Sequence, residues 1–222
     1  MDSVDIRQRV RRVDAALAGM YGPRVLRPRG DALGTLVHTI LTQNTSDANS
    51  DRTFAALRAA YPDWEALARA PAGDIAKVIR TGGLADIKAN RLKQVLETVR
   101  SCAGRLDLGF LSELSDEEAF DYLTSLPGVG PKTAACVLLF ALGRPVFPVD
   151  THVHRVANRV GLVHTSGPAK TQEVLAPLVP PEIVYQFHMN MVTHGRRTCR
   201  AGKPRCEACS LAPGCEWAVR NG

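Results

Sequence analysis

The chain has 222 residues, of which 45% are hydrophobic and 23% are charged. A chain of this length can bury a sizeable core, as one large domain or as two small lobes. Its 28 Lys and Arg outnumber its 22 Asp and Glu, giving a net charge of +6 that favours polyanionic partners. The first residues lack the apolar core of a signal peptide, and no apolar run approaches the ~20 residues of a membrane span. These features favour a soluble cytoplasmic protein with no membrane segment.

Helical periodicity dominates the chain. Apolar residues recur at i, i+3, i+4 and i+7 in three stretches, residues 33–41, 92–102 and 134–142. No convincing alternating strand pattern is present, and turns with Gly or Pro separate the helical windows. The sequence therefore predicts an all-α fold of short packed helices.

Helix starts are indicated by capping residues. Ser115, with Glu118 three residues later, forms a capping-box pattern. Asp63, Asp74 and Asp86 precede further helical windows. A boundary between two lobes is expected near 143–145, where the last apolar helix ends.

The six cysteines fall into two groups. Cys102 and Cys136 occupy apolar positions of helical patterns, and we expect them to be small buried side chains. The other four crowd into 17 residues, a clustering that predicts a metal site. By spacing alone, zinc is the default for four thiolates, with iron and sulfur as the alternative. These four are Cys199, Cys206, Cys209 and Cys215.

A tight helical hairpin is predicted at residues 126–130, Leu-Pro-Gly-Val-Gly. Gly128 and Gly130 permit positive φ and a close approach of the backbone to another molecule. Pro131 suits the first position of the following helix. The free amides of that helix, backed by its dipole, can hold a DNA phosphate. An ordinary helical hairpin is the alternative interpretation.

Two further residues suggest chemistry. Lys132 lies in the first turn of the helix after the hairpin, where the dipole favours the neutral amine that a nucleophile requires. A solvated lysine that contacts phosphate is the alternative. Asp150 precedes a predicted helix and is a good N-cap. A carboxylate there could also stabilise positive charge on a sugar and assist proton transfers.

The string Leu-Pro-Gly-Val-Gly-Pro-Lys, followed by Val-Asp-Thr-His at 149–152, resembles the endonuclease III family of helix-hairpin-helix DNA glycosylases. The resemblance runs from about Asp31 to Cys215. It implies that Lys132 is the Schiff-base nucleophile, that Asp150 is its carboxylate partner and that His152 plays a supporting role. The implied enzyme is a DNA glycosylase and abasic-site lyase for oxidised pyrimidines, acting in base excision repair.

The same resemblance implies a fold, a cofactor and partners. Residues 26–144 would form a six-helix barrel carrying the helix-hairpin-helix, with the hairpin at about 118–142. Residues 1–25 plus 145–222 would form a smaller helical lobe, in which the four clustered cysteines hold a 4Fe-4S cluster. The expected partner is double-stranded DNA with damaged bases or abasic sites, bound by a nucleoid-associated monomer.

An enzyme that acts on a base must extrude it and fill the gap. The resemblance assigns gap filling to Leu84 and to the turn that contains Gln43 and Asn44, although the family's usual Ala-Gln pair reads Gln-Asn here. Ala85 replaces an aromatic residue that often follows the leucine. Core packing for Leu84 and helix capping for the amide pair are the alternatives.

Two groups of residues are expected to contact the DNA backbone. The hairpin residues Gly128, Val129 and Gly130 form one group. The other comprises basic residues around the first two clustered cysteines, Arg200, Lys203 and Arg205, unless these form only a solvated surface.

Two other functions remain open. One is a related glycosylase for alkylated or mismatched bases, because lyase chemistry says little about the base pocket. The other is a non-catalytic DNA-binding or redox-sensing module, which the retention of both Lys132 and Asp150 disfavours.

Overall fold

The computed structural model describes residues 3–221, and within that range helices joined by turns and loops are present and no strand is. The all-α expectation is therefore confirmed. The chain forms two compact units, Pro28–Leu142 and a second unit made of Met1–Arg27 with Gly143–Gly222. The boundaries predicted from the sequence are 25/26 and 144/145.

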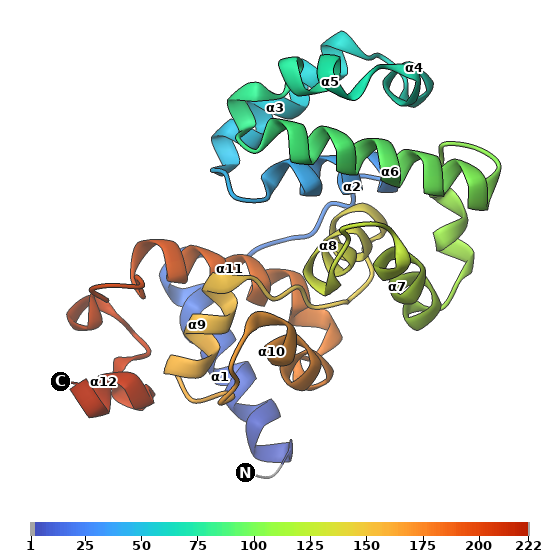
Figure 1. The fold of residues 1–222 in the computed structure, drawn as a ribbon. Helices are drawn as coiled ribbons and strands as arrows, with labels where there is room; N and C mark the ends of the chain where they lie inside the picture. Colours follow the sequence, from blue (N-terminus) through green and yellow to red (C-terminus); the bar gives the residue numbers. More distant parts are fainter. Residues whose placement is uncertain (1–2, 222) are drawn as a thin grey trace. The chain divides into compact units, whose positions relative to one another are not determined.

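The unit 28–142, all of which the structure describes, holds seven α-helices, one more than the expected six (Figure 1). The additional helix arises because Asp63 and Pro71 each begin a short helix of their own. The helices are α2 (Ala32–Thr42), α3 (Asp47–Ala60), α4 (Trp64–Arg69), α5 (Ala72–Val78), α6 (Ala85–Ala103), α7 (Asp116–Ser125) and α8 (Pro131–Leu142). Two 3-10 helices, η1 (Arg80–Gly82) and η2 (Gly109–Glu113), lie between them.

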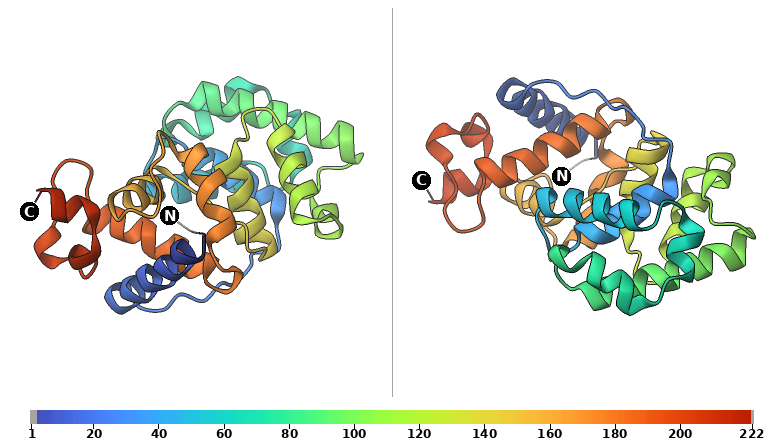
Figure 2. Two further views of the ribbon diagram at one scale, coloured as in Figure 1. Left: turned by 90° about the horizontal axis from the view of Figure 1, so that it is seen from below. Right: turned by 90° about the horizontal axis from the view of Figure 1, so that it is seen from above.

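Helix α2 forms the centre of this unit. It packs against α8, α3 and α6, and Figure 2 shows these neighbours from two further directions. Nine of its eleven residues are buried, and eight of the twelve residues of α8 are buried. A helix that is apolar on nearly all sides is stable only inside a core, which explains this central position.

The capping pattern fixes several helix starts. Both hydrogen bonds of the predicted capping box between Ser115 and Glu118 are present. Asp63 caps α4, with its Oδ1 accepting a hydrogen bond from the Ala66 amide. Asp74 and Asp86 were expected to precede helices but lie inside the first turns of α5 and α6. An acidic side chain also favours the first turn, so its presence does not fix the starting residue.

One buried side chain was predicted wrongly. Cys136 is buried in α8, but Cys102 is exposed, although the four preceding residues of its apolar stripe are buried. Cys102 lies one residue before the end of α6, next to the Gly104 turn. The last turn of this helix therefore extends past the core that its earlier turns contact.

The other unit is built around α11 (Val184–Arg197), which packs against α9 (Thr151–Arg159) and α1 (Ser3–Tyr21). Phe147, which precedes α9, stacks on Phe187 of α11 with ring centroids 5.5 Å apart. The remaining helices are α10 (Pro168–Leu175), α12 (Glu216–Asn221), and the 3-10 helices η3 (Ala176–Leu178), η4 (Pro181–Ile183), η5 (Cys206–Ala208) and η6 (Ala212–Gly214). Within residues 3–221, no helix has both the length and the apolar character to cross a membrane.

Candidate active site and nucleic-acid interface

The hairpin between α7 and α8 uses its two glycines differently. Gly128 has φ of +71°, and a Cβ added there would lie 2.2 Å from Nε of Arg91. Gly130 faces open space, since an added Cβ would meet no atom within 4 Å. The backbone requires glycine at 128, whereas glycine at 130 keeps the surface open to an approaching molecule.

The helix after this turn, α8, begins at Pro131 directly after Gly130. The Gly130 carbonyl accepts a hydrogen bond from the Ala134 amide at 3.1 Å, so Gly130 is the N-cap of α8. The amides that follow in the first turn have no acceptor within the helix and form the positive end of its dipole. Val129 is 5% exposed and anchors the turn, while Lys132 is half-buried at the second helical position. The arrangement suits an anion and an amine at one helix end.

The residues expected to fill a gap in DNA have unusual backbone angles. Asn44 (φ +54°) and Leu84 (φ +51°) are the only non-glycine residues with positive φ among those the structure describes. Both residues are exposed, and Leu84 is 48% exposed. The alternative prediction, that Leu84 packs in the core, is therefore wrong. A left-handed leucine is a true conformational outlier, and such outliers concentrate at functional sites.

Gln43 differs from its neighbour. Its backbone occupies the C-cap of α2, as the capping alternative predicted, and its side-chain Oε1 accepts a hydrogen bond from Nη1 of Arg91. Asn44 is the exposed member of the pair. The arrangement anchors Gln43 and leaves Asn44 at the surface.

In the other unit, Asp150 is the N-cap of α9, with Oδ1 accepting from the Val153 amide at 2.8 Å. The capping interpretation of Asp150 therefore holds, and its second oxygen, Oδ2, lies outside the capping bond. His152 packs against Gly195 of α11, where an added Cβ would lie 2.8 Å from its own Cβ. Burial lowers the pKa of His152. The nearby charge of Asp150 raises this pKa, and that of Arg155 lowers it further. His152 therefore joins α9 to α11 as a neutral ring.

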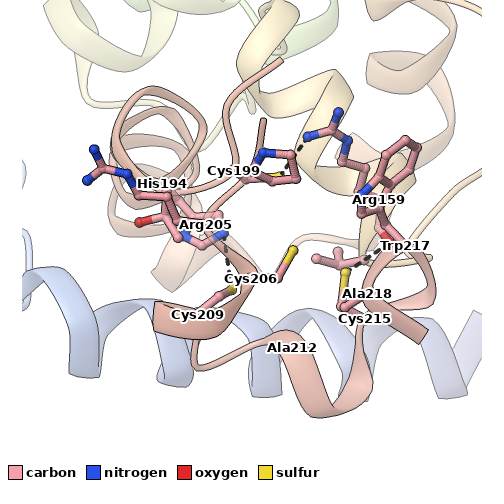
Figure 3. Close-up of a pocket in the computed structure, with 13 residues that line it drawn as sticks. Arg159, His194, Cys199, Arg205, Cys206, Cys209, Ala212, Cys215, Trp217 and Ala218 are labelled. Atoms are coloured by element: carbon pink, nitrogen blue, oxygen red, sulfur yellow. Dashed lines mark hydrogen bonds between the residues drawn. The ribbon is translucent and has the colours of Figure 1, made fainter. Parts of the chain in front are cut away.

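The four clustered cysteines line one small pocket, and Figure 3 shows their side chains there together with His194, Arg159 and Trp217. Cys199 and Cys215 are buried, and Cys206 and Cys209 are half-buried. Desolvation raises the pKa of the Cys206 thiol, and its neighbours Cys215 and Cys199 raise it further. Four crowded thiolates would repel one another unless a cationic group bound them, so the donor chemistry fits a metal centre. Within residues 3–221, no three His, Cys, Asp or Glu side chains are arranged to hold a single metal ion.

The loop that carries these cysteines is held by Arg159 of α9. Its guanidinium donates to the carbonyl oxygens of Arg200 at 2.7 Å and Ala201 at 2.9 Å. It also lies 4.3 Å from the ring centroid of Trp217. Arg200, Lys203 and Arg205 are all exposed on this loop, which leaves their charges available to a polyanion.

Comparison with known proteins identifies the family. Residues 37–181 match the model of the HhH-GPD superfamily of base excision DNA repair proteins. The chain is 35% identical over 193 residues to endonuclease III of Thermotoga maritima, covering 86% of each protein. The chain belongs to the HhH-GPD superfamily. It is an endonuclease III-like DNA glycosylase of base excision repair, as the sequence resemblance predicted.

Two further comparisons describe relatives of this HhH-GPD protein. An endonuclease III trapped as a covalent intermediate with DNA has the same fold, with a TM-score of 0.81 and 26% identity. The match covers 96% of this chain and 97% of that one. A longer Arabidopsis thaliana protein of the DNA glycosylase class is 39% identical over 183 residues, and the match spans 62% of its length.

Sequence reasoning missed three residues of this HhH-GPD protein. Arg159 holds the cysteine loop, Arg91 contacts both Gln43 and the hairpin, and Lys88 is a buried cation at the base of the Asn44 and Leu84 turns. All three act on backbone atoms or on distant side chains, which leave no pattern in the sequence. An isolated basic residue among the apolar positions of α6 is the only indication that the sequence offers for Lys88.

Proposed function

We propose that this glycosylase is bifunctional, removing oxidised pyrimidines and cleaving the strand at the resulting abasic site. The observation that carries the proposal is the half-buried Lys132 in the first turn of α8, directly after a hairpin whose surface is open at Gly130. An amine at this position is placed to act as a nucleophile toward a group bound at the hairpin. The covalent endonuclease III complex with DNA, which shares this fold, is consistent with such a nucleophile.

In the proposed reaction, the Lys132 amine attacks C1′ of the extruded nucleotide, the glycosidic bond breaks and the base leaves with its electron pair and takes up a proton. The nitrogen then loses a proton, and its lone pair breaks the C1′–O4′ bond of the sugar ring. O4′ takes up a proton and becomes a hydroxyl group, which leaves a Schiff base between Lys132 and C1′. Removal of a proton from C2′ then expels the 3′ phosphate by β-elimination, which cleaves the strand 3′ to the site. Water finally hydrolyses the imine and releases Lys132.

Asp150 is proposed to serve the same reaction through Oδ2. A carboxylate stabilises the positive charge that builds on the sugar and can relay protons at the amine. The Oδ1 cap on the Val153 amide holds the carboxylate in one orientation, so structural and catalytic roles coexist. His152 supports this position by packing α9 on α11.

DNA contact is proposed at three places. The α8 amides and the hairpin residues 128–130 bind a phosphate, and Arg200, Lys203 and Arg205 bind others. Leu84 and Asn44 fill the space left by the extruded base, with Gln43 held behind them by Arg91. One protein monomer bound to damaged double-stranded DNA would make all three of these contacts.

The four cysteines are proposed to hold a 4Fe-4S cluster, with zinc as the alternative. When bound, the cluster supplies a covalent crosslink that pins the basic loop. The protein purified without exposure to oxygen should be brown and contain about four irons per chain. A colourless protein with one zinc per chain would support the alternative.

Reductive trapping tests the enzymatic proposal. Wild-type protein, a duplex containing thymine glycol and borohydride should give a covalent protein–DNA adduct, and without borohydride a strand nicked 3′ to the lesion. Lys132→Gln should give neither. An intact duplex with no adduct from wild-type protein would favour a DNA-binding module without catalysis.

The anchored Gln43 and exposed Asn44 favour one alternative, a glycosylase for alkylated or mismatched bases. The shorter Asn44 occupies the position where the family's pattern has Gln, so the base opposite the lesion would be contacted differently. A panel of duplexes with thymine glycol, an alkylated purine or a thymine–guanine mismatch separates the two specificities. Faster excision of either of the last two would replace the oxidised-pyrimidine assignment.

A further inference from the structure

Lys88 is a charged side chain in the interior of the unit 28–142. It lies on the buried face of α6, is 2% exposed and has only apolar residues as buried neighbours on that helix. Burial lowers its pKa, with no neighbouring charge to offset the effect. A buried lysine of this kind requires polar partners with a specific arrangement.

Its partners are two backbone carbonyls from different segments. Nζ donates to the Leu41 oxygen and to the Gly82 oxygen, each at 2.8 Å. Leu41 lies in the last turn of α2, and Gly82 ends η1. The carbonyl groups at the C-terminal end of a helix have no N–H donor within the helix and lie at the negative end of its dipole. They therefore suit an ammonium group.

Beyond each carbonyl the chain turns sharply. Three residues after Leu41 comes Asn44, and two residues after Gly82 comes Leu84, the pair of left-handed non-glycine residues. A strained backbone persists only where the surrounding structure fixes its ends. One ammonium fixes the start of both turns.

We propose that Lys88 is a positioning residue that sets the spacing between the Asn44 turn and the Leu84 turn, so that both side chains enter the DNA duplex together. The inference rests on the proposed gap-filling function of these residues. Lys88 touches neither substrate nor Lys132 in this role. It acts only through the two carbonyls, and its loss should affect extrusion of a base more than chemistry at an abasic sugar.

The test compares two substrates. A thymine-glycol duplex requires base extrusion, whereas a single-stranded oligonucleotide with an abasic site needs no gap to be filled. Lys88→Met keeps the length of the side chain but removes its donors. Excision from the duplex should fall about 10- to 100-fold through misplacement of the turns. Cleavage of the single strand should stay within about twofold of wild type, because Lys132 chemistry is retained.

Lys93→Met is the matched control. Lys93 is half-buried on the same helix and also donates to a carbonyl, that of Ala68, which belongs to neither turn. Lys93→Met should leave the ratio of the two activities unchanged.

If Lys88→Met does not fold, Lys88→Arg provides a second test. Arginine keeps the charge, but its longer, planar head group shifts the two carbonyls. This variant should lower duplex excision about tenfold and spare the single-strand reaction.

Three outcomes are decisive. An equal loss of both activities in the folded Lys88 variant would reduce Lys88 to a general stabilising residue and overturn the inference. No loss of duplex excision would overturn it as well. Inactivity of the wild-type protein on both substrates would instead overturn the proposed function, and this inference with it.

Discussion

Leu84 combines three properties that rarely occur together, a left-handed backbone, a branched side chain and 48% exposure. Each is unfavourable or neutral for the stability of the free protein. A left-handed residue other than glycine costs roughly 1–3 kcal/mol, so a functional benefit is expected to offset the cost. Extrusion of a base from duplex DNA is the benefit that the proposed function provides.

Leu84→Gly should separate stability from activity. Glycine adopts the observed φ without strain, so the free energy of unfolding should stay unchanged or rise by about 1 kcal/mol. Excision from duplex DNA should fall at least about tenfold, because the side chain that fills the gap is gone. Leu84→Ala is the control that loses the side chain and keeps the strain. Thermal melts and single-turnover kinetics measure both effects, and full activity of either variant would remove Leu84 from the site.

His152 provides a prediction for pH dependence. Burial lowers its pKa in the folded protein, so the unfolded chain takes up a proton first as the pH falls below about 6.5. Its contribution to stability is present above that pH and is lost as the pH falls through the folded-state pKa. His152→Gln should reduce the slope of unfolding free energy against pH between 7 and 5, by at most about 1.4 kcal/mol per pH unit. An unchanged slope in denaturant titrations would contradict the half-buried, neutral ring.

At the scale of elements, the hairpin and its helix present one anion site. Gly130 caps α8, and its missing Cβ leaves open space rather than relieving a contact within the protein. The reason for glycine at this position therefore lies outside the chain. A phosphate of the DNA backbone is the partner that suits the free amides.

Gly130→Asp should weaken DNA binding without harming the fold. Aspartate is a favourable N-cap residue, so the melting temperature should stay constant or rise. The new carboxylate would repel the phosphate and lower duplex affinity about tenfold, equivalent to about 1.4 kcal/mol. Gly130→Ala, which adds a methyl group without charge, should have a smaller effect. Normal binding by Gly130→Asp in equilibrium titrations would show that the hairpin does not face DNA.

The cysteine loop gives a second prediction at this scale. Arg200, Lys203 and Arg205 are exposed, and each is proposed to neutralise a phosphate. Replacing all three with Gln should reduce the slope of log affinity against log salt by roughly 2 to 3, since each phosphate contact contributes about 0.9. Absorbance of the metal centre serves as the control for an intact loop. An unchanged slope would make these residues a solvated surface.

At the scale of the whole molecule, the features that the sequence predicted correctly are those that depend on local patterns. The α7–α8 hairpin, the Ser115 capping box and the apolar stripe of α2 depend on residues close in the chain, so their sequence determines them. Lys88 could not be predicted, because its two acceptors are backbone carbonyls and one of them lies 47 residues away. The positive φ of Leu84 was equally hidden, since leucine is not a residue that indicates a left-handed turn.

The proposed reaction depends most on Lys132 as the nucleophile. Mass spectrometry of a proteolytic digest, made after borohydride reduction of the protein on abasic DNA, tests this directly. The sugar remnant should be found on the peptide that contains Lys132. It should be found neither on another lysine nor on the N-terminal amine. A remnant on any other residue, or none at all from protein that binds the DNA, would contradict the account.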